Sequence, residues 1–194
     1  MPIVEGDGEV EAVPVLLRRL LTSMRRHDLL SEIAEPHKTK RTKIWKKGEL
    51  EKAVEYAASE ENCRVILLIY DADDDCAKDF GASLVDRARK ARSDKIIEVA
   101  VAVREYEGWL IAGVRKLRGR YGFPRALEPV ADPESIRGAK EWLDRKMDRA
   151  YKETIHQASF SASFDICAAY RRSHSFRHFC KIIKRISRQL PPDP

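Results

Sequence analysis

The sequence predicts an α/β fold in which helices cover both faces of a parallel, doubly wound sheet, with a helical extension at the C-terminal end. Two strands, expected at residues 63–71 and 95–105, are continuous apolar runs without polar alternation, which is typical of strands buried on both faces. Segments with a helical spacing of apolar residues alternate with the expected strands. This β-α-β order favours parallel strands joined by crossover helices.

The composition is that of one soluble domain. The 194 residues suit a single α/β domain, and apolar residues make up 43% of them, which is enough for a sizeable core. The longest apolar run, residues 65–70, is far shorter than the ~20 residues of a membrane span, and no signal-peptide pattern opens the chain. Four widely spaced cysteines without a Cys-x-x-Cys pair argue against zinc and disulfides. We therefore expect a cytoplasmic protein with no membrane partner.

The N-terminal part of the chain predicts two short strands and two helices. A short apolar stretch at residues 2–4 precedes a Gly-Asp-Gly turn signal and predicts the first strand. Helical spacing of apolar residues begins at Val10, with Pro14 either in the first turn of the helix or at a kink. Residues 29–36 predict a second strand and residues 48–61 a second helix.

The C-terminal part predicts a helical extension. Glycine and proline cluster between residues 119 and 133, which marks a boundary. We expect an α/β domain over residues 1–118 and a helical extension over 119–190 packed on it, followed by a disordered tail at 191–194. The helices expected after the strand at 63–71 are residues 76–92, 108–117, a segment that begins at Asp132-Pro133, 163–172 and 175–186.

Basic residues gather in two segments. Residues 37–47 hold six Lys/Arg and no acid, and residues 171–188 hold seven and no acid. The formal net charge of the chain is +6, so the remainder sums to −7. An acidic body with two basic flanks indicates an anionic partner, nucleic acid before acidic protein or lipid. Trp45 fits stacking on a base and anchoring of its loop equally well. The side chains expected to contact nucleic acid are Lys43, Trp45, Lys46, Lys47, Arg177 and Lys181.

Carboxylates follow three of the expected strands: Glu5, then Asp71 with Asp73, then Glu105 with Glu107. Each one alone equally fits a helix cap or a solvated residue. Ligands bind at the carboxyl ends of parallel strands, however, so the acids are expected to converge if the strands before Glu5 and Asp71 are neighbours. Asp71 and Asp73, two apart on extended backbone, would point to one side. Oxygen ligands of this kind suit Mg²⁺ or Mn²⁺.

Four blocks of sequence carry a resemblance to a known family. They are IVEGDGE (3–9), LLIYDADDD (67–75), REYEGWLIA (104–112) and SFRHF (175–179). In this order they resemble the Toprim-like bacterial family catalogued as domain of unknown function 4276. That family is similar to the Toprim domains of topoisomerases, primases and overcoming-lysogenization-defect nucleases. The resemblance covers most of the chain and implies a Toprim/Rossmann-like sheet.

The resemblance also implies roles for individual acids. Glu5 corresponds to the first-strand glutamate, a general acid/base or metal ligand. Glu107 corresponds to the acid of the Glu-x-Trp block, with Glu105 as its competitor, which we expect to point elsewhere. The residues that correspond to metal ligands are Asp71, Asp73, Glu9 and, as a weaker third aspartate, Asp75.

These observations lead us to expect a Mg²⁺- or Mn²⁺-dependent phosphodiester-cleaving enzyme, a Toprim-type nuclease. A role in bacterial defence against phage or foreign DNA is implied by the resemblance alone. One alternative is a nucleic-acid- or nucleotide-binding accessory protein with a non-catalytic acidic site. Another is a partner module of a separate ATPase, because overcoming-lysogenization-defect nucleases join Toprim to an ATPase and this chain has no Gly-rich Walker-type loop. A homo-oligomer is left open.

Overall fold

A sheet of four parallel strands lies at the centre of the protein. The computed structural model describes residues 1–190, so the tail predicted to be disordered, 191–194, lies outside the described residues. The order of the strands across the sheet is β2-β1-β3-β4, and each neighbouring pair is parallel. The predicted parallel α/β fold and the pairing of the first strand with the strand before Asp71 are confirmed. The strands are β1 (Pro2–Val4), β2 (His37–Lys38), β3 (Val65–Asp71) and β4 (Ile96–Ala102).

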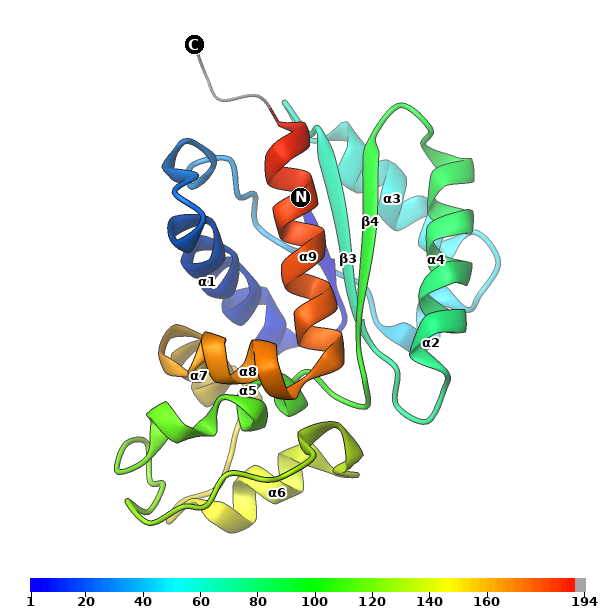
Figure 1. Ribbon diagram of the computed structural model, residues 1–194. Helices are drawn as coiled ribbons and strands as arrows, with labels where there is room; N and C mark the ends of the chain where they lie inside the picture. Colours follow the sequence, from blue (N-terminus) through cyan, green and yellow to red (C-terminus); the bar gives the residue numbers. More distant parts are fainter. Residues whose placement is uncertain (191–194) are drawn as a thin grey trace.

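Helices cover both faces of this sheet (Figure 1). In the part of the chain that the structure describes, no helix is long and apolar enough to cross a membrane. Single 3₁₀ turns lie at His27–Leu29, Val114–Leu117 and Pro133–Ser135, and a π-helical turn lies at Glu153–Gln157. The α-helices are α1 (Asp7–Ser23), α2 (Arg41–Ile44), α3 (Glu49–Ser59), α4 (Ala77–Ala91), α5 (Glu107–Ala112), α6 (Ala139–Lys146), α7 (Ala158–Ser163), α8 (Ile166–Arg172) and α9 (His174–Gln189).

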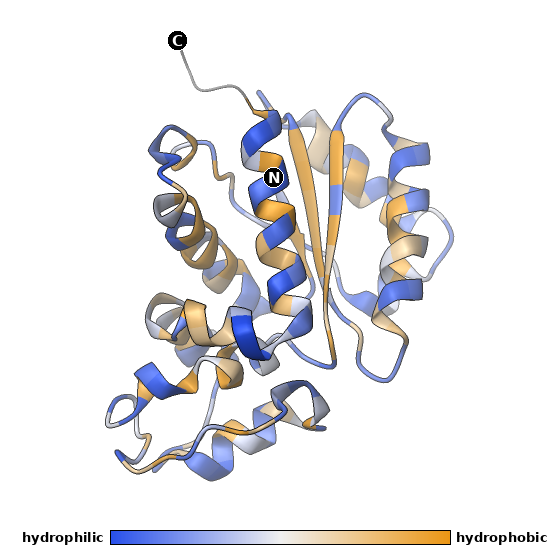
Figure 2. Cartoon of the chain, viewed as in Figure 1, coloured by the Kyte–Doolittle hydropathy of each residue, from blue (hydrophilic) through white to orange (hydrophobic). Residues whose placement is uncertain are grey.

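The strands divide the apolar side chains into two cores. Along β3, Leu67 and Ile69 face the core made with α1 and α9, whereas Ile66 and Leu68 face the core made with α3 and α4. Both faces of the strand are therefore buried, and Figure 2 shows β3 as hydrophobic along almost its whole length. The C-terminal helices share the first of these cores, since the Trp109 ring of α5 stacks on Phe179 of α9 with centroids 4.9 Å apart.

The second strand lies outside its predicted range. We expected it at residues 29–36, but β2 (His37–Lys38) opens the basic segment, and the Thr39 N–H continues its pairing by donating to the Val4 carbonyl at 2.9 Å. Leu29, in the 3₁₀ turn, and Ile33, in irregular chain, instead pack against the core beside α1. The apolar residues that suggested a strand therefore bury their side chains without joining the sheet.

Three helices begin three or more residues from their predicted start, among them α8, which begins at Ile166 rather than Ser163. The first helix, α1, begins at Asp7 rather than Val10, which places Pro14 inside the helix rather than in its first turn. Asp132 caps a single 3₁₀ turn by accepting the Glu134 N–H, and α6 begins only after Gly138, which has a φ of +67°. Glycine adopts this left-handed conformation readily, and it separates the two helical segments. The sequence pattern did not predict α2, α7 or the π-helical turn.

Gly113, at the end of α5, gives a test of this packing. A Cβ atom at this position would lie 2.5 Å from Phe164 Cδ2 and 2.6 Å from the Asp165 carbonyl oxygen. We expect Gly113→Ala to lower the free energy of unfolding by roughly 1–3 kcal/mol through overpacking. The matched control is Gly108→Ala in the same helix, where the nearest atom would be 3.7 Å away. Urea denaturation of both variants checks this, and equal stabilities would contradict it.

Candidate active site

Four carboxylates meet at the carboxyl edge of the sheet. Glu5 follows β1, Asp71 ends β3, Glu9 lies in the first turn of α1, and Glu107 begins α5 after β4. Glu9, Asp71 and Glu107 are buried, and Glu5 is half-buried. Glu5, Glu9 and Glu107 each raise the pKa of Asp71. We call these four residues the acidic cluster.

Glu107 is the most deeply buried member of the acidic cluster, with an exposed fraction of 0%. Its Oε1 accepts hydrogen bonds from the Tyr151 hydroxyl at 2.9 Å and from Gln157 Nε2 at 3.2 Å. Its Oε2 is buried and has no hydrogen-bond partner among the described residues. Burial raises the pKa of Glu107 to about 8, so the protonated form predominates at neutral pH.

Asp71 lies between the other acids. Its Oδ1 accepts the Tyr106 N–H at 2.8 Å, which fixes the carboxylate against the segment that leads into α5. Burial raises the pKa of Asp71 well above its usual range, and Glu9, Glu107 and then Glu5 raise it further. The cluster therefore holds fewer negative charges near pH 7 than its four carboxyl groups would carry in water.

Glu9 and Glu5 complete the cluster from the N-terminal segment. Glu9 reaches back to accept the Gly6 N–H, which helps to cap α1. Burial raises its pKa to about 7, and Glu5 adds to that shift. Burial also raises the pKa of Glu5, as does Asp73, and Glu5 Oε2 is buried without a hydrogen-bond partner in the described chain.

Lys140 is a cation that the sequence pattern did not single out. Its Nζ lies 2.8 Å from Glu153 Oε1, and its charge lowers the pKa of every member of the acidic cluster. Burial lowers the pKa of Lys140 itself, but Glu107 and Glu153 raise it more, so the net shift is upward. Lys140 lies far from the cluster in sequence, and no local motif indicates it.

Glu105, the competitor of Glu107, serves α6 instead. Its two carboxylate oxygens accept the backbone N–H groups of Ala139 at 2.9 Å and of Lys140 at 3.3 Å. A carboxylate at a helix N-terminus is favoured by the unsatisfied N–H groups and by the helix dipole. Glu105 thus points away from the acidic cluster and holds the turn of α6 that carries Lys140.

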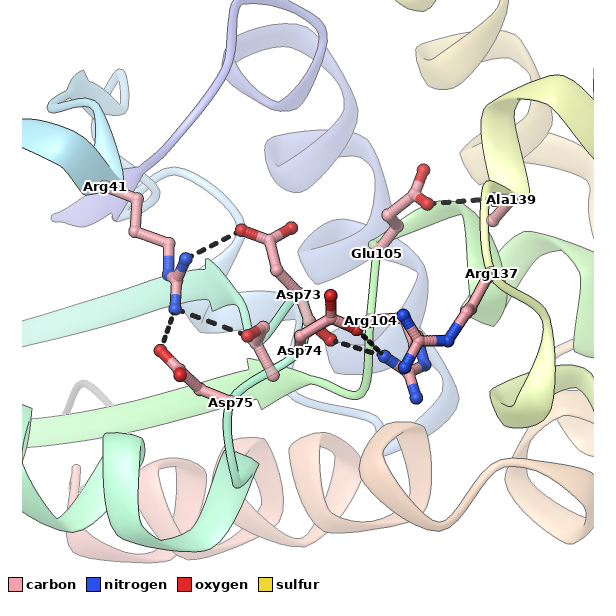
Figure 3. A network of polar contacts seen from close by, with 9 residues as sticks. Arg41, Asp73, Asp74, Asp75, Arg104, Glu105, Arg137 and Ala139 are labelled. Carbon is pink, nitrogen blue, oxygen red and sulfur yellow. Dashed lines mark hydrogen bonds and ion pairs between the residues drawn. The ribbon is translucent and has the colours of Figure 1, made fainter.

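Asp73 and Asp75 are placed differently from the expectation. The strand ends at Asp71, and Asp73 has a φ of +50°, so the argument from extended backbone does not apply to it. Asp73 pairs with Arg41 at 2.7 Å, and Asp75 pairs with the same guanidinium (Figure 3). Asp74 pairs with Arg104 and, at 2.8 Å, with Arg137. Asp73 influences Glu5 but is neutralised by Arg41, which argues against the predicted roles of Asp73 and Asp75 as metal ligands.

The sequence of the chain matches a protein family over most of its length. Residues 4–184 match the family described as Domain of unknown function (DUF4276). The chain belongs to this family. The predicted resemblance is thereby confirmed, while the relation to Toprim domains stays a prediction. No curated protein and no solved structure matches the chain.

The predicted nucleic-acid contacts of this DUF4276 chain lie on two separate elements. Lys43, Lys46 and Lys47 are exposed around α2. Trp45 is 51% exposed, and its ring packs 5.5 Å from that of Phe80, so the side chain anchors the loop and still presents a surface. On α9, Lys181 is exposed, whereas Arg177 donates to the carbonyls of Tyr170 and Arg171 at the end of α8.

The acidic cluster offers the donor atoms that a hard divalent cation prefers. The unpartnered oxygens of Glu5 and Glu107 are of the kind that suits Mg²⁺ or Mn²⁺. Across residues 1–190, no three His, Cys, Asp or Glu side chains are grouped as ligands of one ion. The oxygens of the acidic cluster therefore suit the cation in their chemistry, while this structure does not gather Glu5, Glu9 and Asp71 as its ligands.

The raised pKa of Glu107 predicts how stability depends on pH. The unfolded pKa is about 4.3 and the folded pKa is about 8, so between these values the folded state binds more protons than the unfolded state. Stability from this group is fully present below about pH 4 and is lost as the pH rises toward 8. Glutamine mimics the protonated acid. With EDTA present, wild type should therefore lose stability relative to Glu107→Gln by up to ~1.4 kcal/mol per pH unit.

Urea denaturation at pH 5, 6, 7 and 8 measures this difference. The control is Glu11→Gln, which removes an exposed acid from α1. This variant should follow wild type at every pH. A Glu107→Gln curve that runs parallel to wild type would show that the Glu107 carboxyl does not titrate in this range.

Proposed function

We propose that this chain is a divalent-metal-dependent hydrolase of phosphate esters, with nucleic-acid phosphodiesters as its substrates. The observation that carries the proposal is the Glu107 carboxyl, fully buried with one oxygen unpartnered among the described residues, beside Asp71 and Glu9 at the carboxyl edge of a parallel sheet. Ligands of open α/β sheets bind at this edge. A Toprim-type nuclease is the specific form that we favour, and a role in bacterial defence would follow from it.

The energetic cost of the acidic cluster supports a functional role. Buried carboxylates lose hydration, and those that lie close together repel one another. Apolar side chains of similar volume would remove this cost, because a buried ionic group often stabilises a fold less than well-packed apolar residues do. Carboxyl groups with strongly raised pKa values in one place are characteristic of sites that transfer protons or bind cations.

The acids suit different steps of ester hydrolysis. A cation held by Asp71, Glu5 and Glu9 would supply an activated water and neutralise charge on the phosphoryl group. With a pKa of about 8, Glu107 carries a proton at neutral pH that it can donate to a leaving oxygen.

Lys140 suits the binding of a phosphate oxygen. Its ammonium group lies beside the acidic cluster, where it interacts with Glu107 and Asp71. The same lysine lines an open cavity of about 460 Å³ together with Tyr151 and Glu153. Tyr151 also donates to Glu107, so this residue connects the cavity to the buried acid, and none of the four acids of the cluster lines the cavity itself. We therefore place the approach of the substrate on the side of α6.

A second candidate function is a nucleic-acid- or nucleotide-binding accessory protein, or a partner module of a separate ATPase, with a non-catalytic acidic site. The observation that favours it is the pairing of Asp73 and Asp75 with Arg41, which leaves fewer acids to bind a cation. Binding without metal-dependent cleavage would support this candidate.

The first test replaces acids of the acidic cluster by amides of the same size and shape, which removes the ionisable group. Asp71→Asn and Glu107→Gln should each lower Mg²⁺- or Mn²⁺-dependent cleavage of DNA, RNA or bis(p-nitrophenyl) phosphate by at least ~10²-fold. Both should leave the melting temperature unchanged or raise it, because each removes a buried carboxyl group whose charged form is disfavoured by burial. Glu11→Gln is the control and should retain activity.

Two outcomes would contradict the hydrolase. One is the absence of cleavage by wild type with either metal on any of these substrates. The other is full activity in Asp71→Asn. A melting temperature of Asp71→Asn far below that of wild type would point to a structural role for this carboxylate.

The second test concerns the basic segment around α2. If Lys43, Lys46 and Lys47 contact phosphates, the logarithm of the affinity for DNA or RNA should fall linearly with the logarithm of salt concentration. Each neutralised phosphate adds ~0.7–0.9 to that slope. The triple alanine variant should therefore have a flatter slope by about two units or more, measured by fluorescence anisotropy from 50 to 300 mM salt.

The control for the salt series changes three exposed lysines elsewhere, Lys52, Lys90 and Lys116. This triple alanine variant removes the same net charge and should keep most of the wild-type slope. Equal slopes for the two triple variants would show that net charge alone, and not the α2 segment, sets the affinity.

A further inference from the structure

The outer edge of β4 is free of any strand in the part of the chain that the structure describes. β4 is the last strand of the sheet and pairs only with β3. The Ile96 N–H donates to the Arg64 carbonyl at 3.1 Å, and the Ala102 carbonyl accepts the Ala72 N–H at 2.9 Å. Backbone groups alternate in direction along a strand. The N–H and C=O groups of every second residue between Ile96 and Ala102, Val99 and Val101 included, therefore point outward.

Side chains occupy the two ends of this edge but not its middle. Arg89 Nη2 donates to the Ile97 carbonyl at 3.2 Å, and the Val103 N–H donates to Ser175 Oγ at 3.3 Å. Between these bonds, the N–H and C=O groups of Val99 and Val101 have no partner among residues 1–190. Natural proteins usually protect such an edge with proline, a bulge or a covering element, because it can pair with another chain.

A groove gives access to this edge. It has a volume of about 420 Å³ and runs between α4 and α9, with Val99, Val101 and Val103 at its base, and Figure 1 shows β4 between these two helices. Small residues of α4, including Gly81, line one wall. A Cβ atom on Gly81 would lie 3.3 Å from Val101 Cγ2, so a larger side chain would narrow the groove over the strand.

The walls of the groove are basic. Lys78, Arg89 and Arg185 line it and are exposed. Glu98 is the one acid among the described residues that line it, and this acid is paired with Arg185. An occupant that carries acidic side chains would therefore meet complementary charge along the α4 wall, at Lys78 and Arg89.

We propose that the β4 edge binds an extended acidic segment of a partner protein as an added strand. The outward N–H and C=O groups of Val99 and Val101 require a partner that itself offers alternating backbone donors and acceptors. An extended peptide has them, and strand addition to a free edge is a common mode of peptide recognition. Nucleic acid carries suitable charge but no such alternating backbone. A second copy of this chain would place one basic groove against another around a two-fold axis.

The test uses a capped, fluorescein-labelled peptide of seven residues that alternates glutamate and valine. Only alternate residues of an added strand face β4 with their backbone. N-methylation of the residues whose N–H groups face β4 should abolish binding, because it removes those donors. N-methylation of the residues in between should leave binding intact. Fluorescence anisotropy at low salt measures the affinity. Equal effects of the two methylation patterns, or no binding of the parent peptide, would overturn the proposal.

Protein variants test the edge and the charge separately. Val101→Pro removes one outward N–H without breaking a bond to β3, and Val101→Ala is its control because it loses the side chain but keeps the N–H. The proline variant should bind at least ~10-fold more weakly than the alanine variant. Lys78→Glu with Arg89→Glu tests the charge in an intact strand and should also weaken binding by at least ~10-fold.

Further outcomes distinguish other occupants. A lysine–valine peptide that binds as well as the glutamate–valine peptide would overturn the role of charge. Concentration-dependent self-association, measured by sedimentation velocity and lost in Val101→Pro, would assign the edge to a second copy. Competition by single-stranded DNA for the peptide, lost in Lys78→Glu/Arg89→Glu, would assign the groove to nucleic acid. None of these readouts depends on hydrolysis, so failure here leaves the proposed enzyme untouched.

Discussion

The buried carboxyl of Glu107 is the constraint around which the C-terminal half of the chain is arranged. A buried acid is tolerable only if its oxygens find donors or if it keeps its proton. The donors Tyr151 and Gln157 reach it from the segment after α6, and Lys140 supplies a positive charge from α6 itself. The helices after residue 118 therefore do more than extend the sheet domain, because they enclose its carboxyl edge.

The acids at the end of β3 form two tiers with different electrostatics. Asp73, Asp74 and Asp75 are exposed, and Arg41, Arg104 and Arg137 neutralise them in ordinary surface ion pairs. Asp71 is buried and faces other acids, with Lys140 as the cation that lowers its pKa. The repulsion expected from four neighbouring aspartates is thus resolved for the outer three and remains at the inner one. This contrast is the reason that our proposal gives a catalytic role to Asp71 rather than to the whole run of aspartates.

Local patterns in the sequence predicted the parts of the fold that local energetics determine. Continuous apolar runs predicted β3 and β4, and the end of the second run made Glu105 and Glu107 candidates. The preference for Glu107 came from the family resemblance. Asp73 was predicted to point to the same side as Asp71. Its left-handed backbone, at a φ of +50°, breaks the alternation of side-chain directions along an extended strand on which that prediction relied. Lys140 could not be predicted, since its position depends on contacts between Glu105 and the first turn of α6, which are distant in sequence.

The free edge of β4 and the acidic cluster are joined by one short segment. Val103 donates its N–H to Ser175 at the end of the edge, and three residues later the Tyr106 N–H donates to Asp71, just before Glu107. Arg104 lies between them, and its carbonyl accepts the Asp73 N–H at 3.0 Å. A strand added beside Val101 would therefore end next to the stretch of backbone that positions Asp71 and Glu107. Coupling between two sites requires such a physical connection and differential contacts in two states. Residues 103–107 supply such a connection between the β4 edge and the acidic cluster.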